Sequence, residues 1–480
     1  MASIDLSPPR SRNLAIRIST LPVALVLLVL LVASILSALG LLATVPNTFA
    51  DEAIYIELAR HLGASGKFQI LGVSFPALTY GPAYVAIIAP IFRIARTARD
   101  AYMMIRGLNA LIFATATIPT FFIALRAVSR RSAMIVAAAA VALPASAYTS
   151  KIMSESLAYP VVLWCLFATV RVIERPTLGR QSALLVGLVI TPAVRFELLA
   201  LAPALALGCA VGANGRIRTR CRTLMPLLTG TGLLTVGAVG LLRATSRTSV
   251  GAHGFSIHQF SILHFGALLL GSLGAVDLYA GVLPLASAVL IVIGMRRGAL
   301  WVSSGVRRVV LVMAVGGSTL LLTGSAYLAT VPAANRPPIP TDRYTFYVVP
   351  LLFVAFAAWI EGGMIREAGT AWVAAGAAVL PILAALVGVN NDPHGTENGL
   401  AFIPWIGVSA GRLVLLLPFL AAYCGLCAFL LIRPTTGAHT LIKPALTLVT
   451  ITSVCAFSSK SRVACTHHCR GGWMHTAGRV

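Results

Sequence analysis

The sequence predicts an all-α fold, a polytopic transmembrane helical bundle with amphipathic or re-entrant helices in its first outer loop. Of the 480 residues, 58% are hydrophobic and only 11% are charged, and the mean hydropathy is +0.89. A soluble protein of this length carries about a quarter charged residues, so that class is excluded. The apolar residues also come in blocks of roughly 17–25, the length that crosses the hydrocarbon core of a bilayer.

The blocks divide the chain into three parts. Residues 1–20 form a cytoplasmic N-terminus, residues 21–458 the transmembrane domain, and residues 459–480 a tail that is predicted to be disordered. We expect about 13 spans, each near the length that a helix needs to cross the bilayer. They are 21–43, 107–126, 132–149, 157–173, 182–194, 196–212, 224–242, 276–294, 309–331, 344–360, 369–389, 413–432 and 444–458.

The first outer loop, residues 44–106, contains a shorter apolar stretch. Residues 82–94 are apolar but too few to cross the bilayer, so a re-entrant or surface helix is expected there. Counting this stretch as a span would reverse the orientation of every later segment. It would also place the four arginines between residues 216 and 222 outside the cell, against the positive-inside rule.

The net charge of +23 by itself would be compatible with nucleic-acid binding. However, 33 of the 37 basic residues are arginines, and many of them lie in short loops between apolar blocks. This distribution is typical of membrane topology and not of a nucleic-acid-binding surface. We therefore expect a multi-pass protein of the plasma or inner membrane, with a cytoplasmic N-terminus and no nucleic-acid partner.

The same topology places ten of the 14 carboxylates outside the cytoplasm. This asymmetry indicates outward-facing carboxylate chemistry, although longer and more polar outer loops would also produce it. The ten are Asp51, Glu52, Glu57, Asp100, Glu155, Glu197, Asp277, Asp342, Asp392 and Glu397.

Two of these carboxylates begin a predicted helix just after the first span. Residues 51–61 have the apolar spacing of a short amphipathic helix, and Asp51 and Glu52 lie in its first turn. The helix dipole stabilises an acid at that position, which is one explanation for the pair. The other explanation is a general base at the membrane–water boundary, where a lipid-borne substrate can reach it.

An ordered set of motifs resembles the GT-C glycosyltransferases, including protein O-mannosyltransferases, aminoarabinose transferases and RgtA/B/C/D-like enzymes. The motifs are DEAIYIELARHL from Asp51, TYGPAYVAIIAPIF from Thr79, RGLN from Arg106, SESLAYPVVLW around Glu155, TPAVRFELLALAPAL around Arg195 and DRYTFYVVPLLFVAFA around Arg343. The resemblance implies transfer of a sugar from a polyprenyl-phosphate donor to an envelope acceptor on the outer face of the membrane. It also implies acids at positions 51 and 155 and a surface helix at 82–94.

The chemistry of such a transfer suggests roles for particular residues. Asp51 is the expected general base, with Glu52 as the second candidate. The departing phosphate needs cations or hydrogen-bond donors, and an arginine fork suits it best. The expected substrate-binding residues are Lys67, Tyr80, Arg106, Glu155, Arg195, Glu197, Arg343 and Tyr344. Purely structural ion pairs remain open for Arg195 with Glu197 and for Arg343 with Asp342.

No metal and no cofactor are expected beyond the lipid-linked sugar itself. Neither of the first two outer loops contains a DxD sequence. The spacing of His253, His258 and His264, in a predicted polar outer loop at 243–275, fits no common zinc site. Two other classes of function stay open at this point. One is a transporter or flippase of a lipid-linked intermediate, and the other is a non-catalytic membrane scaffold.

Overall fold

The computed structural model describes most of the chain between residues 21 and 389. The described ranges are 21–41, 50–70, 73–74, 80–213, 215–246, 260–299, 302–330, 342–363 and 369–389. The predicted spans 413–432 and 444–458 and the tail from residue 459 lie outside these ranges, as do His253 and His258.

The described part is built of helices, with one two-stranded antiparallel ribbon of β1 (Gln69–Ile70) and β2 (Val73–Ser74). In chain order the α-helices are α2 (Leu21–Leu41), α3 (Ala50–Ser65), α4 (Pro82–Ile88), α5 (Ile91–Ile94), α6 (Ala98–Ala114), α7 (Thr117–Ala124), α8 (Arg130–Val141), α9 (Glu155–Glu174), α10 (Leu178–Val194), α11 (Leu201–Gly212), α12 (Ile217–Thr223), α13 (Met225–Ser246), α14 (Ile262–Ala280), α15 (Leu283–Arg296), α16 (Ser304–Thr330), α17 (Val349–Glu361) and α18 (Thr370–Val389). Short 3-10 turns are η1 (Pro144–Ser150), η2 (Phe196–Ala200), η5 (Asp342–Tyr344) and η6 (Phe346–Val348).

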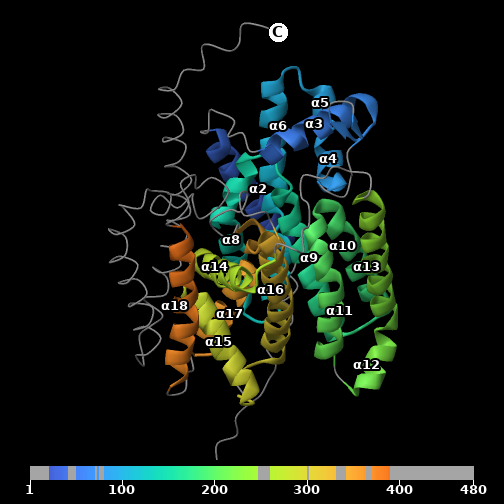
Figure 1. Cartoon of the computed structure of the whole chain (residues 1–480). Helices are drawn as coiled ribbons and strands as arrows, with labels where there is room; N and C mark the ends of the chain where they lie inside the picture. Colours follow the sequence, from blue (N-terminus) through green and yellow to red (C-terminus); the bar gives the residue numbers. More distant parts are fainter. Residues whose placement is uncertain are drawn as a thin grey trace, which may run out of the picture.

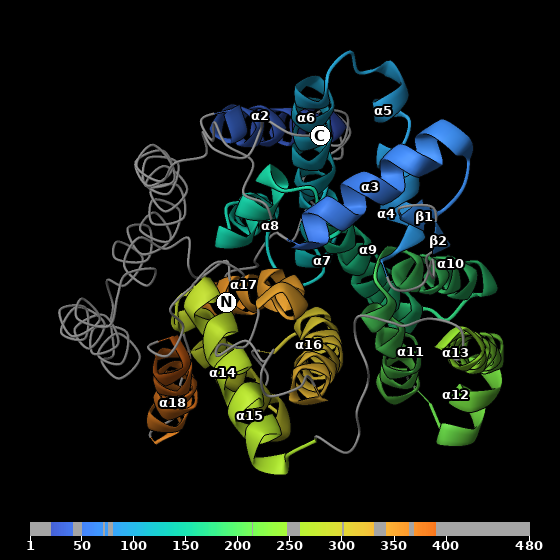
Figure 2. The same ribbon diagram turned by 45° about the horizontal axis from the view of Figure 1, so that its top comes forward.

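The short helices of the first loop lie together at one end of the molecule. In Figure 1, α3, α4 and α5 are at the top beside the start of α6, whereas α12 and the end of α15 are at the bottom. The turned view in Figure 2 shows α3 crossing the end of the bundle above α9 and α4. The predicted helix at 51–61 and the short helix at 82–94 are thus both present, the latter as α4 and α5 separated at Ala89 and Pro90.

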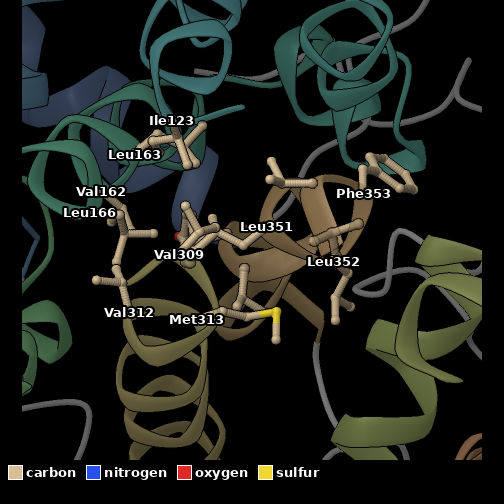
Figure 3. Packing of buried hydrophobic residues seen from close by; sticks show 14 of the residues in the cluster. Ile123, Val162, Leu163, Leu166, Val309, Val312, Met313, Leu351, Leu352 and Phe353 are labelled. Carbon is tan, nitrogen blue, oxygen red and sulfur yellow. The ribbon is translucent and has the colours of Figure 1, made fainter. Parts of the chain in front are cut away.

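The main apolar core lies where α7, α9, α16 and α17 meet. Figure 3 shows side chains from these four helices pointing toward one another. Leu163 of α9, Val309 of α16 and Leu351 of α17 are each at most 1% exposed. Burying a side chain of this size stabilises the fold by about 1.5–3 kcal/mol, so this core holds the long helices in register.

Several predicted spans coincide with helices of the structure, including 21–43, 157–173, 182–194, 224–242, 309–331 and 369–389. Among the described residues, three helices are long and apolar enough to cross a membrane alone, namely Ala98–Ala124, Glu155–Glu174 and Ser304–Thr330. The bent pair α12–α13 makes a fourth if it is counted as one span, and eight further apolar helices are shorter. The polytopic helical membrane fold is confirmed, and the count of 13 spans remains a prediction.

The second span begins earlier than the predicted residue 107. Helix α6 starts at Ala98 because Thr97 and Asp100 form a reciprocal capping box, in which each side chain bonds the other's backbone N–H at 3.1 Å. Such a box satisfies two of the donors that a helix start leaves unbonded. Asp100 is therefore a capping residue, and the polar first turn of α6 extends beyond the apolar block.

The predicted span 276–294 is wrong, and so is the predicted outer loop over residues 262–275; its residues 247–259 lie outside the described ranges. Residues 262–280 form helix α14, and the chain turns at Gly281 and Val282 before α15. Gly281 is left-handed, with a φ of 87°, and Val282 also has a positive φ, 61°. The apolar block was continuous in hydropathy across this turn, so periodicity alone did not reveal the glycine break.

Glycine at position 305 allows α16 to touch the end of α7. A Cβ atom there would lie 1.7 Å from the carbonyl oxygen of Arg126, which is backbone and cannot rotate away. The absence of a side chain is thus required for this helix contact. By contrast, a Cβ at Gly232 or Gly237 on α13 would meet nothing within 4 Å.

We predict that Gly305→Ala destabilises the protein by about 1–3 kcal/mol, because α16 must move away from α7. Gly237→Ala is the matched control, and it should be neutral or slightly stabilising because alanine favours a helix. Thermal unfolding in neutral detergent measures both. Equal unfolding temperatures for Gly305→Ala and the wild type would contradict the packing described here.

Candidate functional site

Seven of the residues singled out from the sequence meet at the end of the bundle that carries α3. They come from five separate segments. Asp51 lies on α3, Tyr80 precedes α4, Glu155 begins α9, Arg195 and Glu197 follow α10, and Arg343 and Tyr344 form η5. The site thus joins residues that are almost 300 positions apart.

The centre of the site is a chain of ion pairs around Glu155. Its Oε1 atom lies 2.6 Å from Nη1 of Arg195 and 2.9 Å from Nε of Arg343. Arg343 then reaches outward, and its Nη2 donates to Oδ2 of Asp51 at 2.8 Å. Arg195 also pairs more loosely with Glu197, at 3.7 Å. One buried carboxylate therefore holds two guanidinium groups, and one of them holds Asp51.

Exposure changes across this chain of ion pairs. The side chains of Glu155 and Arg195 are 0% and 5% exposed, whereas those of Arg343 and Asp51 are 14% and 23% exposed. Glu155 and Arg195 are thus the enclosed pair of the site, whereas Asp51 and Arg343 are partly accessible, as is Glu197 at 32%.

Tyr80 approaches Asp51 from a strained turn. Its hydroxyl donates to Oδ1 of Asp51 at 3.4 Å. Burial and the neighbouring Asp51 carboxylate raise the pKa of Tyr80, so the hydroxyl keeps its proton and acts as a donor. The next residue, Gly81, has a φ of 50°, and a Cβ there would lie 1.8 Å from the carbonyl oxygen of Val194. Gly81 thus packs the turn directly against the residue preceding Arg195.

Both arginines remain cationic. Burial alone would lower the pKa of Arg195 and of Arg343, but Glu155 together with the other neighbouring acids and tyrosines outweighs burial and raises both pKa values. The ring of Tyr344 lies near the two guanidinium carbons, at 5.1 Å for Arg195 and 5.7 Å for Arg343, within cation–π range.

Glu52 binds different partners from Asp51 and lies outside the chain of ion pairs. It is 2% exposed, and its Oε1 accepts hydrogen bonds from the Tyr102 hydroxyl and from the Ile152 backbone, both at 2.9 Å. These bonds fasten α3 to α6 and to the segment before α9. The second candidate base is therefore a buried acceptor that fixes the position of its neighbour.

Two other predicted residues lie outside the ion-pair cluster. Arg106 is buried on α6, where it lies over the Tyr102 ring at 5.4 Å and so belongs with Glu52. Lys67 is exposed and follows the end of α3. Asp51 is at the other end of this helix, so about 20 Å of helix separates the two. The structure does not bring Lys67 to the other predicted residues.

Tyrosines that the sequence analysis did not select line the same region. The Tyr55 hydroxyl donates to Ser154 at 2.9 Å, directly before Glu155, and its ring packs edge-on against Tyr80 at 5.5 Å. Tyr347 is fully buried near Arg195 and Glu155. The signal for Tyr55 was present in the sequence, since it lies one helical turn after Asp51 on the same face.

The site contains two arginines and three carboxylates. Its positive charge is therefore already neutralised and is not freely available to bind an anion. Across the described ranges, no three His, Cys, Asp or Glu side chains come close enough together to hold a metal ion. The positively charged groups of the ion-pair cluster are the guanidinium groups of Arg195 and Arg343, each already paired with a carboxylate. Any added anion must therefore compete with a carboxylate for an arginine.

The fold and the site define an integral membrane protein with a carboxylate–arginine centre at one end of its helical bundle. No protein-family model matches the chain, and no curated protein sequence matches it. Among solved structures, it is similar to ArnT from Cupriavidus metallidurans, a GT-C aminoarabinose transferase. The apo structure aligns with 91% of this chain and 76% of ArnT, at 16% identity and a TM-score of 0.50. The structure with bound undecaprenyl phosphate aligns with 90% and 75%, at 17% identity and a TM-score of 0.49.

At this sequence identity the similarity concerns the fold. The helical membrane fold expected from the motifs is confirmed, because the apo ArnT structure matches along nine tenths of the chain. The roles of individual residues are argued from their geometry.

We predict that Glu155→Gln destabilises the fold by about 3–5 kcal/mol, because it leaves two buried guanidinium groups without their shared counter-ion. Glu57→Gln on α3 is the matched control, since Glu57 pairs with the exposed Arg60 at 3.0 Å. The control should cost about 0–1 kcal/mol. Thermal unfolding in detergent compares the two, and similar losses would show that the Glu155 ion pairs do not hold the site together.

Proposed function

We propose that this protein is a glycosyltransferase of the GT-C type that acts at the extracytoplasmic face of the membrane. It transfers a sugar from a polyprenyl-phosphate donor to a glycan, lipid or protein acceptor of the cell envelope. Asp51 is the general base, and no metal takes part. The observation that carries the proposal is the contact between Asp51 and Arg343, backed by Glu155 and Arg195. The ArnT-like fold and the ordered motifs support the same class.

The position of Asp51 suits a base. It lies in the first turn of α3, where backbone N–H groups and the helix dipole stabilise a carboxylate. Its side chain is partly exposed, so an acceptor hydroxyl can reach it. Glu155, the other acid of the centre, is enclosed and neutralised by two arginines, which makes it a poor proton acceptor.

The reaction is a single displacement. The acceptor oxygen attacks C1 of the sugar, Asp51 takes the acceptor's proton, and the bond from C1 to the phosphate oxygen breaks. The electron pair leaves with the polyprenyl phosphate, whose negative charge is stabilised by the guanidinium of Arg343. Attack opposite to the leaving group inverts the configuration at C1.

Binding of the phosphate requires an exchange of partners. Arg343 already contacts two carboxylates, Asp51 and Glu155, and a third anion beside them would be repelled. Asp51 is the more exposed partner, so the phosphate displaces it from Arg343. The exchange frees Asp51 for the acceptor at the moment when the donor arrives.

The activity test compares envelope glycans in a strain lacking the gene after complementation. We predict that the wild type restores the missing glycan, whereas Asp51→Asn restores less than about 1% of it, a loss of the size expected when a general base is removed. Glu57→Gln, on the same helix, is the control and should restore it fully. Full restoration by Asp51→Asn, at equal membrane levels, would remove Asp51 from the role of base and favour a scaffold or a transporter.

The exchange makes a second, opposite prediction for binding. Asp51→Asn should bind polyprenyl phosphate about fivefold more tightly than the wild type, because a competing ion pair of ~1 kcal/mol has been removed. Arg343→Gln should bind it more weakly, and the double variant should behave like Arg343→Gln. Titration of the purified proteins in detergent measures all four affinities. Weaker binding by Asp51→Asn would show that Asp51 helps to hold the phosphate.

A further inference from the structure

A second charged cluster lies at the far end of α9. This helix begins at Glu155 and ends at Glu174, 20 residues in all. At 1.5 Å per residue, the two glutamates are about 29 Å apart along the axis, close to the thickness of the hydrocarbon core. Glu174 thus lies near the opposite bilayer surface from the Asp51 site.

Four arginines from four different segments converge on Glu174. Arg126 follows α7, and its Nη1 lies 3.4 Å from the Glu174 carboxylate. Arg171 of α9 and Arg308 of α16 each approach it at 3.6 Å. Arg180, at the start of α10, donates from Nη1 to the backbone carbonyl of Arg171 at 2.8 Å, which places it beside this group. The contact of Gly305 with Arg126 brings α16, and with it Arg308, into this group.

One carboxylate cannot balance these four cations. Three arginines share Glu174 at distances of 3.4–3.6 Å, and the closest atom of Arg171, its buried Nε, lies 3.6 Å from Oε2, too far for a hydrogen bond. The cluster has an excess of three positive charges from four guanidinium groups and one carboxylate. Like charges this close repel one another unless an anion joins them.

The surroundings indicate where that anion comes from. The side chains of Arg126, Arg171 and Arg308 are about one third exposed, at 31%, 34% and 30%, so a ligand can reach them. Next to Arg180, the apolar Leu178 is 66% exposed on the outer surface of the bundle. Apolar side chains directly beside exposed cations are typical of the boundary between lipid headgroups and acyl chains.

We propose that the cluster of Arg126, Arg171, Arg180 and Arg308 around Glu174 binds the phosphate headgroup of an acidic phospholipid. The lipid belongs to the leaflet opposite the Asp51 site. Its phosphate lies between the guanidinium groups, and its acyl chains lie along the exposed apolar face of α10. The bound lipid links the ends of α7, α9, α10 and α16, and so stabilises the bundle below the proposed transfer site.

Native mass spectrometry of the full chain in neutral detergent tests the site with phosphatidylglycerol and phosphatidylcholine as probes. The wild type should retain phosphatidylglycerol in preference to phosphatidylcholine. Arg126→Gln/Arg308→Gln should weaken phosphatidylglycerol binding about tenfold or more, the loss expected for two charge-assisted contacts. Glu174→Gln should strengthen it severalfold, because the competing carboxylate is gone.

The matched control removes two other arginines at the same end of the protein. Arg218 and Arg222 lie on α12 and are exposed, with no ion pair to Glu174. Arg218→Gln/Arg222→Gln should leave phosphatidylglycerol binding within about twofold of the wild type, because surface charge contributes little by itself. An equal loss in this control would show general electrostatic attraction and overturn the site. The same would follow if Glu174→Gln weakened binding.

A further experiment distinguishes a lipid headgroup from a soluble anion as the ligand. Inorganic phosphate, titrated into lipid-free protein, should raise the unfolding temperature far less than phosphatidylglycerol does. If inorganic phosphate gave the full effect and competed with the lipid, the ligand would be a soluble phosphate and the lipid assignment would be wrong. The readouts do not depend on sugar transfer, so this proposal and the proposed function can fail separately.

Discussion

The arrangement of the candidate site depends on one buried carboxylate, that of Glu155. It is fully enclosed, and its Oε1 atom is shared by Arg195 and Arg343. A buried charge is costly unless it is paired, and the same is true of the two guanidinium groups. Because Glu155 pairs with both arginines, it ties α9, the turn after α10 and η5 to one another. Asp51 then binds to a rigid cationic group.

The same centre explains how one site can hold a base and an anion-binding group together. An arginine and a carboxylate in contact neutralise each other, which stabilises the site but also keeps both groups paired. Arg343 has a second, buried partner in Glu155, so it stays in place when its contact with Asp51 opens. Asp51 is more exposed than Glu155, so the contact of Arg343 with Asp51 opens and its contact with Glu155 stays closed. In this account, donor binding and base release are one event.

Much of this organisation could be predicted from the sequence, and the missing parts have physical causes. Hydropathy located several of the long helices, and the charge distribution placed Asp51, Glu155 and Glu197 on one side, where the structure brings them together. Hydropathy predicted one continuous span across Gly281 and Val282, where the structure has a turn. A left-handed turn made of apolar residues does not change the hydropathy profile. Hydropathy also placed the start of α6 too late, because the first turn of this helix is polar and carries the capping box of Thr97 and Asp100. The sharing of Glu155 by two arginines depends on packing between distant segments, which no local pattern encodes.

The most direct test of the account is a structure of the full chain with polyprenyl phosphate bound. We expect a phosphate oxygen within hydrogen-bond distance of Arg343, with Glu155 still paired to both arginines. We also expect Asp51 to have moved away from its 2.8 Å contact with Arg343 and to face the acceptor side. An intact Asp51–Arg343 contact, with the phosphate bound elsewhere, would contradict the proposed exchange and the role of Asp51 that follows from it.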